Sequence, residues 1–276
     1  MSTEKLTAES ATRGQYRTRA LLRGLALLAC FKPASPELTL AELAEGSGLK
    51  KATAFRLLAS LVDTGFLRRD SERNTYQVGA AVLPIASAFQ ESEALAALAE
   101  PRLRRLADET GQTATLALAD NGGMVNLSLA YPDRPLRRTT YVGERHSLHS
   151  TATGKAIAAA LRYGEVEALL EANGMNADTP NTIVTWDAFK VELDEVRRTG
   201  WAFDDEEAIL GVRCVGAAIL DYTGRPVAAV SVAGATGEYE GEAIERLARE
   251  VIAVADLLSR ELGHVRHDQV SLIGAE

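Results

Sequence analysis

The sequence predicts an α+β fold in two domains: a small helical head that carries a β-hairpin, and a larger domain with an antiparallel sheet flanked by helices. Three observations support this prediction. Residues 39–78 contain two helical patterns, a glycine-containing turn and a hairpin pattern. From residue 95 onward, strand patterns and helical patterns follow each other. The 276 residues, 46% of them hydrophobic and 25% charged, are enough for two globular cores.

The two helices of the head are marked by their ends. Thr39 and Glu42 fit a capping box, which predicts that a helix starts there. Gly46 and Gly48 predict its end and a tight turn, because glycine adopts positive φ without a Cβ clash. A second helix is expected over 50–64, and its core-facing positions are Ala54, Leu57, Leu58 and Leu61. Two such helices at a short turn are typical of a helix-turn-helix.

A hairpin with strands near 66–69 and 75–78 completes a winged helix-turn-helix. Residues 1–78 hold twelve Lys and Arg against eight Asp and Glu, whereas the whole chain has a formal net charge of −8. Phosphate contacts depend on local potential, so this basic head suits double-stranded DNA. The expected DNA contacts are Lys50, Lys51, Thr53, Phe55, Arg56, Arg68, Arg69 and Arg73. The alternative is a dimerising helical hairpin with a solvated charged face.

The rest of the chain is assigned in order. A flexible tail (1–16) precedes the winged domain (17–78), which begins with a helix over 17–31 whose apolar stripe is Ala20, Leu21, Leu25, Leu28 and Ala29. An apolar linker helix (79–94) is expected to pair with its copy in a homodimer or homotetramer. The larger domain spans 95–264 and a C-terminal tail spans 265–276. Its expected helices are 95–110, 151–162, 164–173, 186–199 and 240–262, and its expected strands are 112–119, 124–131, 137–142, 201–205, 213–221 and 226–233.

Several classes of protein are disfavoured. No apolar run is long enough to span a membrane or to serve as a signal peptide, which predicts a cytoplasmic protein. Only Cys30 and Cys214 are present, so neither a disulfide framework nor a thiolate zinc site is expected. The pair His146 and His149 lacks partners at ligand spacing, and no phosphate-binding loop or nucleophile-elbow motif is present. We therefore expect no metal, no cofactor and no enzymatic activity.

Two segments resemble a known family. The stretch Gly200–Ile219, GWAFDDEEAILGVRCVGAAI, is similar to the signature of IclR-type bacterial transcriptional regulators, and Leu148–Ala156, LHSTATGKA, supports the resemblance. It covers about residues 17–264. The resemblance implies a DNA-binding winged domain, a linker helix and a GAF-like domain that binds a small organic effector. Most members are repressors, some are activators, and they act as dimers or tetramers at their operators.

Position-matching to the family implies effector contacts at Arg138, His146, Ala152, Thr153, Asp204, Val212, Cys214, Ser231 and Ala233. The residues support part of this set independently. A helix beginning near Thr151 leaves the N–H groups of Ala152, Thr153 and Gly154 unpaired, which suits a carboxylate. Positions 138 and 146 are often apolar in family members with small keto-acid effectors, whereas here they are Arg and His. The expected effector is therefore an organic acid whose other end carries a hydroxyl or a carbonyl that Asp204 and Ser231 can satisfy.

Alternatives stay open for these residues. Cys214 fits a small buried hydrophobe as well as a ligand contact, and Arg138 or His146 could face solvent. Cys214, His149 and Asp204 are the residue types of a cysteine hydrolase, which would require mutual hydrogen-bond contact. A GAF-like sensor that acts only through protein partners is a third class, and it would leave the basic head without a role.

Overall fold

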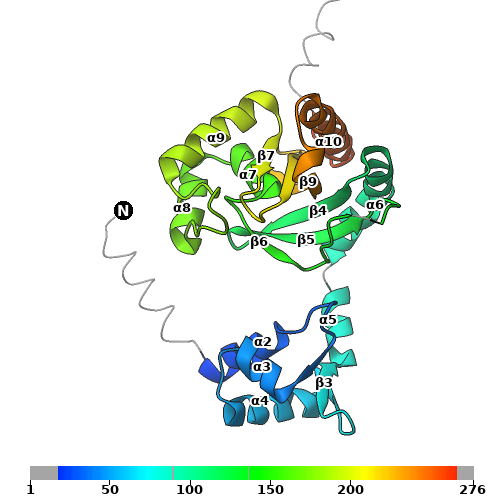
Figure 1. The fold of residues 1–276 in the computed structure, drawn as a ribbon, viewed down its shortest axis with the longest axis vertical. Coiled ribbons are helices and arrows are strands. Elements are labelled where there is room, and N and C mark those ends of the chain that lie inside the picture. The colour runs from blue at the N-terminus through cyan, green and yellow to red at the C-terminus, as the bar shows by residue number, and fades with distance from the viewer. Residues whose placement is uncertain (1–17, 89, 136, 266–276) are drawn as a thin grey trace, which may run out of the picture. The chain divides into compact units, whose positions relative to one another are not determined.

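The computed structural model describes residues 18–88, 90–135 and 137–265. The chain divides into two compact units, and the boundary between them in the sequence falls after Gln90. The first contains short helices and a three-stranded sheet, and the second contains helices around a six-stranded sheet (Figure 1). The predicted two-domain α+β fold is confirmed. Within the three described ranges, no helix is both long enough and apolar enough to cross a membrane.

The N-terminal unit is a winged helix-turn-helix. Thr39 accepts the N–H of Glu42 while the Glu42 carboxylate accepts the N–H of Thr39, so the predicted capping box is confirmed. Gly48 has a φ of +66° in the turn before the second helix. The elements of this unit are α2 (Arg19–Leu28), β1 (Glu37–Thr39), α3 (Leu40–Gly46), α4 (Lys51–Asp63), β2 (Leu67–Asp70), β3 (Thr75–Val78), η1 (Ala80–Val82) and α5 (Leu83–Ser87).

The core of this unit differs from the prediction at α2. Leu27 is fully buried with α3 and α4 residues, whereas Leu21 and Leu25 of the predicted stripe are 61% and 52% exposed. Leu28 of the predicted stripe does pack against this core, so the stripe was wrong only in part: the side of α2 that faces the core is centred on Leu27. The strand β1 was not predicted either. It pairs antiparallel with β3, so the wing is the outer part of a sheet with the order β1-β3-β2.

The predicted linker helix over 79–94 is not one continuous helix. Residues 80–87 form η1 and α5, and Pro84 stands in the first turn of α5, where its missing N–H costs no helical hydrogen bond. Residue 89 lies outside the described residues, and α6 (Gln90–Thr110) begins directly after it. The domain limits proposed from the sequence therefore stay predictions.

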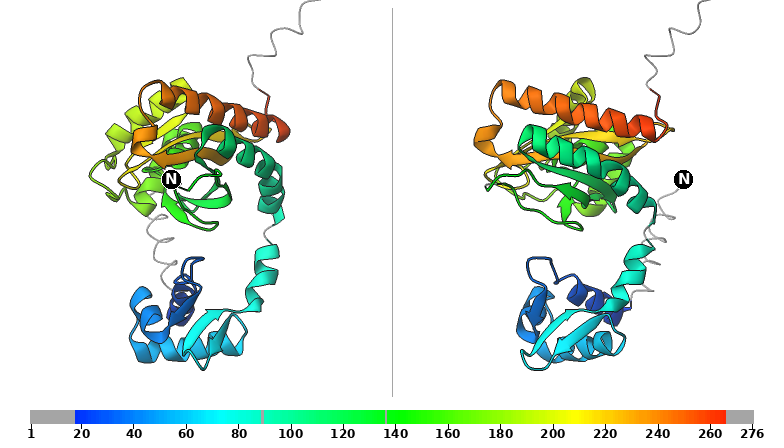
Figure 2. Two further views of the ribbon diagram at one scale, coloured as in Figure 1. Left: turned by 45° about the vertical axis from the view of Figure 1, so that its right-hand side comes forward. Right: turned by 90° about the vertical axis from the view of Figure 1, so that its right-hand side faces the viewer.

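The C-terminal unit is built on one antiparallel sheet with the strand order β6-β5-β4-β9-β8-β7. Its strands are β4 (Thr113–Asp120), β5 (Gly123–Ala130), β6 (Arg145–Ser147), β7 (Ala202–Asp205), β8 (Val212–Leu220) and β9 (Pro226–Ala235). Its further helices are α7 (Ala152–Ala160), α8 (Tyr163–Asn173), α9 (Trp186–Thr199), η2 (Thr236–Glu238) and α10 (Glu242–Glu261). The helices α6 and α10 share a core with one face of the sheet, and α7, α8 and α9 share a second core with the other (Figure 2).

The strand predicted over 137–142 is absent, and the edge strand of this region is β6. Residues 137–142 are instead positioned by hydrogen bonds from side chains. Thr113 Oγ1 donates to the carbonyl of Arg138 at 2.7 Å, and Asn126 Nδ2 donates to Thr140 Oγ1 at 2.7 Å. The Tyr131 hydroxyl donates to the carbonyl of Thr140. These tertiary contacts replace a strand ladder, so β-propensity alone misled the prediction.

Candidate ligand cavity and nucleic-acid interface

A small cavity of about 40 Å³, called here the inner cavity, lies where the start of α7 meets the strands β7, β8 and β9. All nine residues predicted from the sequence line it: Arg138, His146, Ala152, Thr153, Asp204, Val212, Cys214, Ser231 and Ala233. Four further lining residues were not among the predicted contacts: Thr115, Thr151, Ala208 and Ile209. The structure thus brings the whole predicted set together around one space.

The start of α7 is held against the sheet by two glycines. A Cβ at Gly154 would lie 2.1 Å from the carbonyl oxygen of Leu148, and one at Gly216 would lie 2.9 Å from the backbone of Ala152. Thr151 is the N-cap, and its Oγ1 accepts the N–H of Gly154 at 3.2 Å. The expectation of three unpaired N–H groups is corrected to two, since those of Ala152 and Thr153 alone have no acceptor among the described residues.

Asp204 stands at the wall of the inner cavity and is 1% exposed. Its Oδ1 accepts the N–H of Glu207 at 2.8 Å and that of Ala208 at 3.3 Å, which fixes the following loop. Burial raises the pKa of Asp204 to about 6, against the opposing effect of these hydrogen bonds. This carboxyl therefore changes its protonation state close to physiological pH.

The Cys214 side chain faces Asp204 across the β7–β8 pair. Burial raises the pKa of the Cys214 thiol well above its ordinary value, and the charge of Asp204 adds to this effect. The thiol is therefore protonated and a poor nucleophile. His149, the base that a cysteine hydrolase would need, is 2% exposed and its Nε2 lies 3.0 Å from the carbonyl oxygen of Asn176. This arrangement disfavours the hydrolase alternative.

The strands β8 and β9 form one wall of the inner cavity, because alternate residues of a strand point to the same face of the sheet. Cys214 pairs with Ala233 and Gly216 pairs with Ser231 in the antiparallel register, so these positions lie on one face of the sheet. Thr115 pairs with Ser231 from the other side because β4 is hydrogen-bonded to β9. The sequence analysis missed Thr115 since nothing local indicates that two strands more than a hundred residues apart are neighbours.

Two basic side chains complete the lining. Arg138 is half-buried on the segment before β6. His146 lies on β6 with its Nε2 3.6 Å from a carboxylate oxygen of Glu144. Burial lowers the pKa of His146, while the Glu144 charge opposes that effect. Arg138 is therefore the permanent positive charge of the cavity, and His146 is a neutral hydrogen-bonding group at neutral pH.

The N-terminal unit presents a basic, exposed surface on α4 and on the wing. Lys51, Phe55 and Arg56 are exposed on one side of α4, while Ala54 and Leu58 on the other side are buried. Lys50 is the exposed N-cap and Thr53 is half-buried. The major groove of B-DNA admits an α-helix, so an exposed basic helix face of this kind suits it.

The three predicted arginines of the wing are all exposed, with different surroundings. Arg69 donates to Asn74 Oδ1 at 2.8 Å, and Arg73 lies 3.3 Å from a carboxylate oxygen of Glu37. Arg68 has no ion pair within 4.0 Å among the described residues. Among the described residues, Arg68 and Arg69 therefore have no carboxylate at ion-pair distance, whereas Arg73 is paired with Glu37 and Asp70.

Comparison with known proteins identifies the family. The C-terminal domain of the bacterial transcriptional regulator IclR matches residues 88–260, and the IclR helix-turn-helix domain matches residues 20–71. The chain belongs to the IclR family of transcriptional regulators. The transcriptional repressor IclR of Escherichia coli (strain K12) is 31% identical over 252 residues, which is 91% of this chain and 92% of that protein.

Solved structures agree with this assignment. The crystal structure of Thermotoga maritima IclR has a TM-score of 0.70 at 27% identity, covering 90% of this chain and 100% of that one. An IclR homologue from Microbacterium hydrocarbonoxydans, complexed with 4-hydroxybenzoate, has a TM-score of 0.70 at 20% identity over 88% and 99% of the two chains, and this shows a shared fold.

The IclR-family chain is therefore a DNA-binding transcriptional regulator with an effector-binding C-terminal domain, and its homologues include repressors. The prediction that it is not an enzyme is confirmed by the family.

Proposed function

We propose that this regulator is a repressor whose affinity for its operator changes when a small organic acid binds with its carboxylate at the inner cavity. The main support for an acidic effector is the pair of N–H groups of Ala152 and Thr153 at the start of α7, which have no acceptor among the described residues. They lie beside the charge of Arg138. Free N–H groups at a helix start attract anions through hydrogen bonds and through the helix dipole.

The repressor role rests on the relative from E. coli, which is a repressor and is similar over 91% of this chain. The DNA contacts that we propose are Lys50, Lys51, Thr53, Phe55 and Arg56 of α4 together with Arg68, Arg69 and Arg73 of the wing. Arg56 would contact base edges, while the wing would grip phosphates. The site of action is the cytoplasm because the operator is there.

We further propose that two copies pair through the N-terminal unit, as a dimer or as part of a tetramer. Leu21, Leu22 and Leu25 of α2 are 61%, 50% and 52% exposed, and Leu83 and Ile85 of α5 are 64% and 61% exposed. So many large apolar side chains on one small unit mark a protein interface. A pair of recognition helices would then read two half-sites. Sedimentation of the full chain measures the number of copies.

The test is a binding titration of the full chain against DNA from just upstream of its own coding region, at two salt concentrations and with an unrelated competitor duplex. We expect specific, salt-dependent binding that a carboxylic acid alters and its amide does not. A reporter gene behind this DNA gives the sign, and transcription that falls when the protein is present makes it a repressor. Equal effects of an acid and its amide would exclude the carboxylate site.

A further inference from the structure

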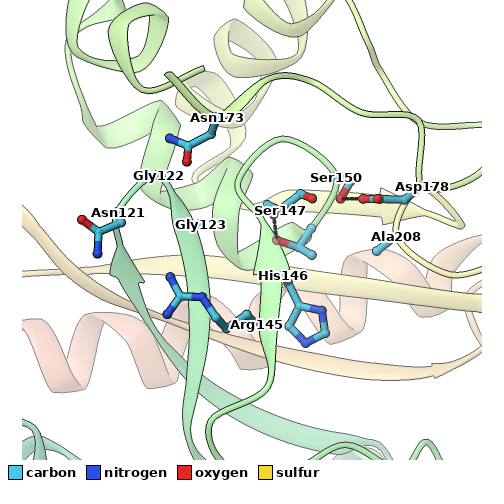
Figure 3. Close-up of a pocket in the computed structure, with 11 residues that line it drawn as sticks. Asn121, Gly122, Gly123, Arg145, His146, Ser147, Ser150, Asn173, Asp178 and Ala208 are labelled. Atoms are coloured by element: carbon cyan, nitrogen blue, oxygen red, sulfur yellow. Dashed lines mark hydrogen bonds between the residues drawn. The ribbon is translucent and has the colours of Figure 1, made fainter. Parts of the chain in front are cut away.

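A second pocket of about 500 Å³, called here the outer pocket, opens beside the inner cavity (Figure 3). His146, Thr151 and Ala208 line both spaces, so the two adjoin along these three residues. The inner cavity of about 40 Å³ has room for little more than a water molecule. Small-molecule sites usually hold roughly 300–1,000 Å³, and of these two adjoining spaces only the outer pocket reaches that range.

Several hydrogen-bond donors of the outer pocket are already used within the protein. Asn121 Nδ2 donates to Asp120 at 2.9 Å, Asn173 Nδ2 donates to the carbonyl of Leu169 at 2.8 Å, and Ser150 Oγ donates to Asp178 Oδ2 at 2.7 Å, as Figure 3 shows for the last of these. Among the described residues, the side-chain oxygens Asn121 Oδ1, Asn173 Oδ1 and Asp178 Oδ1 receive no hydrogen bond.

The charged residues of the outer pocket also favour a ligand group that donates hydrogen bonds. Arg145 leaves β6 on the side away from His146 in Figure 3, and its Nη1 lies 2.7 Å from Asp120 Oδ2. Its positive charge is therefore already matched. Asp178 has no ion pair within 4.0 Å among the described residues, and the Asp178 carboxylate lines the pocket. A second anionic group would be repelled here, whereas a neutral group that donates hydrogen bonds would find open acceptors.

We propose that the effector is a polyhydroxylated carboxylic acid that spans both spaces, with its carboxylate at the start of α7 and its hydroxyl-bearing tail in the outer pocket against Asn121, Asn173 and Asp178. This inference rests on the proposed function, since it extends the same site. The carboxylate would accept hydrogen bonds from the N–H groups at the inner cavity. The tail would fill the larger volume of the outer pocket and donate hydrogen bonds to the unpaired acceptors there.

Calorimetry of the full chain with three acids of equal charge tests the inference: pyruvate as a short acid, gluconate as a hydroxylated acid and hexanoate as an apolar acid of the same chain length. We expect gluconate to bind about tenfold tighter than hexanoate or better, because several hydrogen bonds are gained. Asn173→Ala should weaken gluconate about fivefold while leaving pyruvate unchanged. The control Asn181→Ala, whose amide donates to the carbonyl of Asp205 outside both pockets, should change neither.

The possible failures are distinguishable. Equal affinities for gluconate and hexanoate, or a gluconate affinity that Asn173→Ala leaves unchanged, would overturn the spanning ligand, and pyruvate binding that alters operator affinity would still support the proposed function. If none of the three acids binds and none alters operator binding, both the proposed function and this inference fail.

Discussion

The two units of this regulator use positive charge in opposite ways. In the N-terminal unit, Lys51 and Arg56 project from α4 into solvent and have no ion pair within 4.0 Å among the described residues. In the C-terminal unit, Lys155 of α7 is 1% exposed. Its Nζ lies 3.0 Å from Glu192 and 2.6 Å from the carbonyl oxygen of Phe203, and it also contacts Glu207. Exposed charges are available to a partner, whereas a buried charge is committed to the fold.

The difference has a physical cause. A charge in water costs nothing to keep and can be exchanged for a phosphate when DNA arrives. A buried charge is tolerated only when oppositely charged or hydrogen-bonding partners are close by. The removal of one partner leaves the others buried without compensation. The Lys155 network joins α7, α9 and the loop after β7, so it supports two walls of the inner cavity, at the start of α7 and at Asp204.

The largest effect is expected from Lys155→Met. The substitution keeps a similar volume but leaves Glu207 buried without its cation, and one oxygen of Glu207 already lacks a hydrogen-bond partner. We expect a loss of about 3–5 kcal/mol in the free energy of unfolding, measured by urea denaturation. Lys190→Met is the matched control at an exposed lysine whose Nζ lies 4.9 Å from the Tyr163 ring centroid, with an expected loss of about 1 kcal/mol or less. Similar losses in the free energy of unfolding for both variants would show that the buried lysine contributes no more to stability than the exposed one.

The next effect concerns Asp204, a buried carboxyl beside this network. Its folded-state pKa of about 6 lies above its ordinary value of 3.8, so the folded chain holds this proton more tightly than the unfolded chain. The free energy of unfolding therefore decreases as pH rises from about 4 to about 6, by roughly 3 kcal/mol at most, and the cost persists above that range.

Asp204→Asn removes this titration while it keeps an oxygen that can accept the N–H of Glu207. We expect the stability of the wild type, measured relative to this variant by denaturation at a series of pH values, to decline between about pH 4 and pH 6.5. Parallel curves for the two proteins would show that Asp204 is ionised throughout. That result would remove the distinction between this carboxyl and an exposed one.

How far the sequence predicted these features depends on the distance between the interacting residues. The capping box of Thr39 and Glu42 is local, and it was predicted correctly. Lys155 contacts Glu192 and Glu207, which are 37 and 52 residues further along the chain, and no local pattern indicates those pairs. Nine of the thirteen residues that line the inner cavity were found through family resemblance and strand alternation.

The incorrect predictions also concern features that depend on contacts between residues far apart in the sequence. Thr115 was missed because the pairing of β4 with β9 is non-local. The strand expected over 137–142 and the buried stripe of α2 were both inferred from local sequence, and tertiary contacts overrode the first entirely and the second in part. The outer pocket could not be anticipated, because Asn121, Ser150 and Asn173 come from three separate turns and helix ends that only the folded sheet brings together.

The smallest effects are expected for the exposed cations, and they separate two kinds of DNA contact. Arg56→Ala should weaken operator binding by about 1–3 kcal/mol and relax sequence preference, since a base contact is lost, while leaving the free energy of unfolding nearly unchanged. Arg68→Ala should weaken operator and unrelated DNA alike and reduce the salt slope by about one, as expected for one lost phosphate contact. Arg73→Ala should change the slope less, because Glu37 already competes for that guanidinium at 3.3 Å. Titrations of all three variants at several salt concentrations provide the comparison. If Arg56→Ala leaves the operator affinity unchanged, α4 does not read the operator through this face, and the exposed charges of the N-terminal unit need another role.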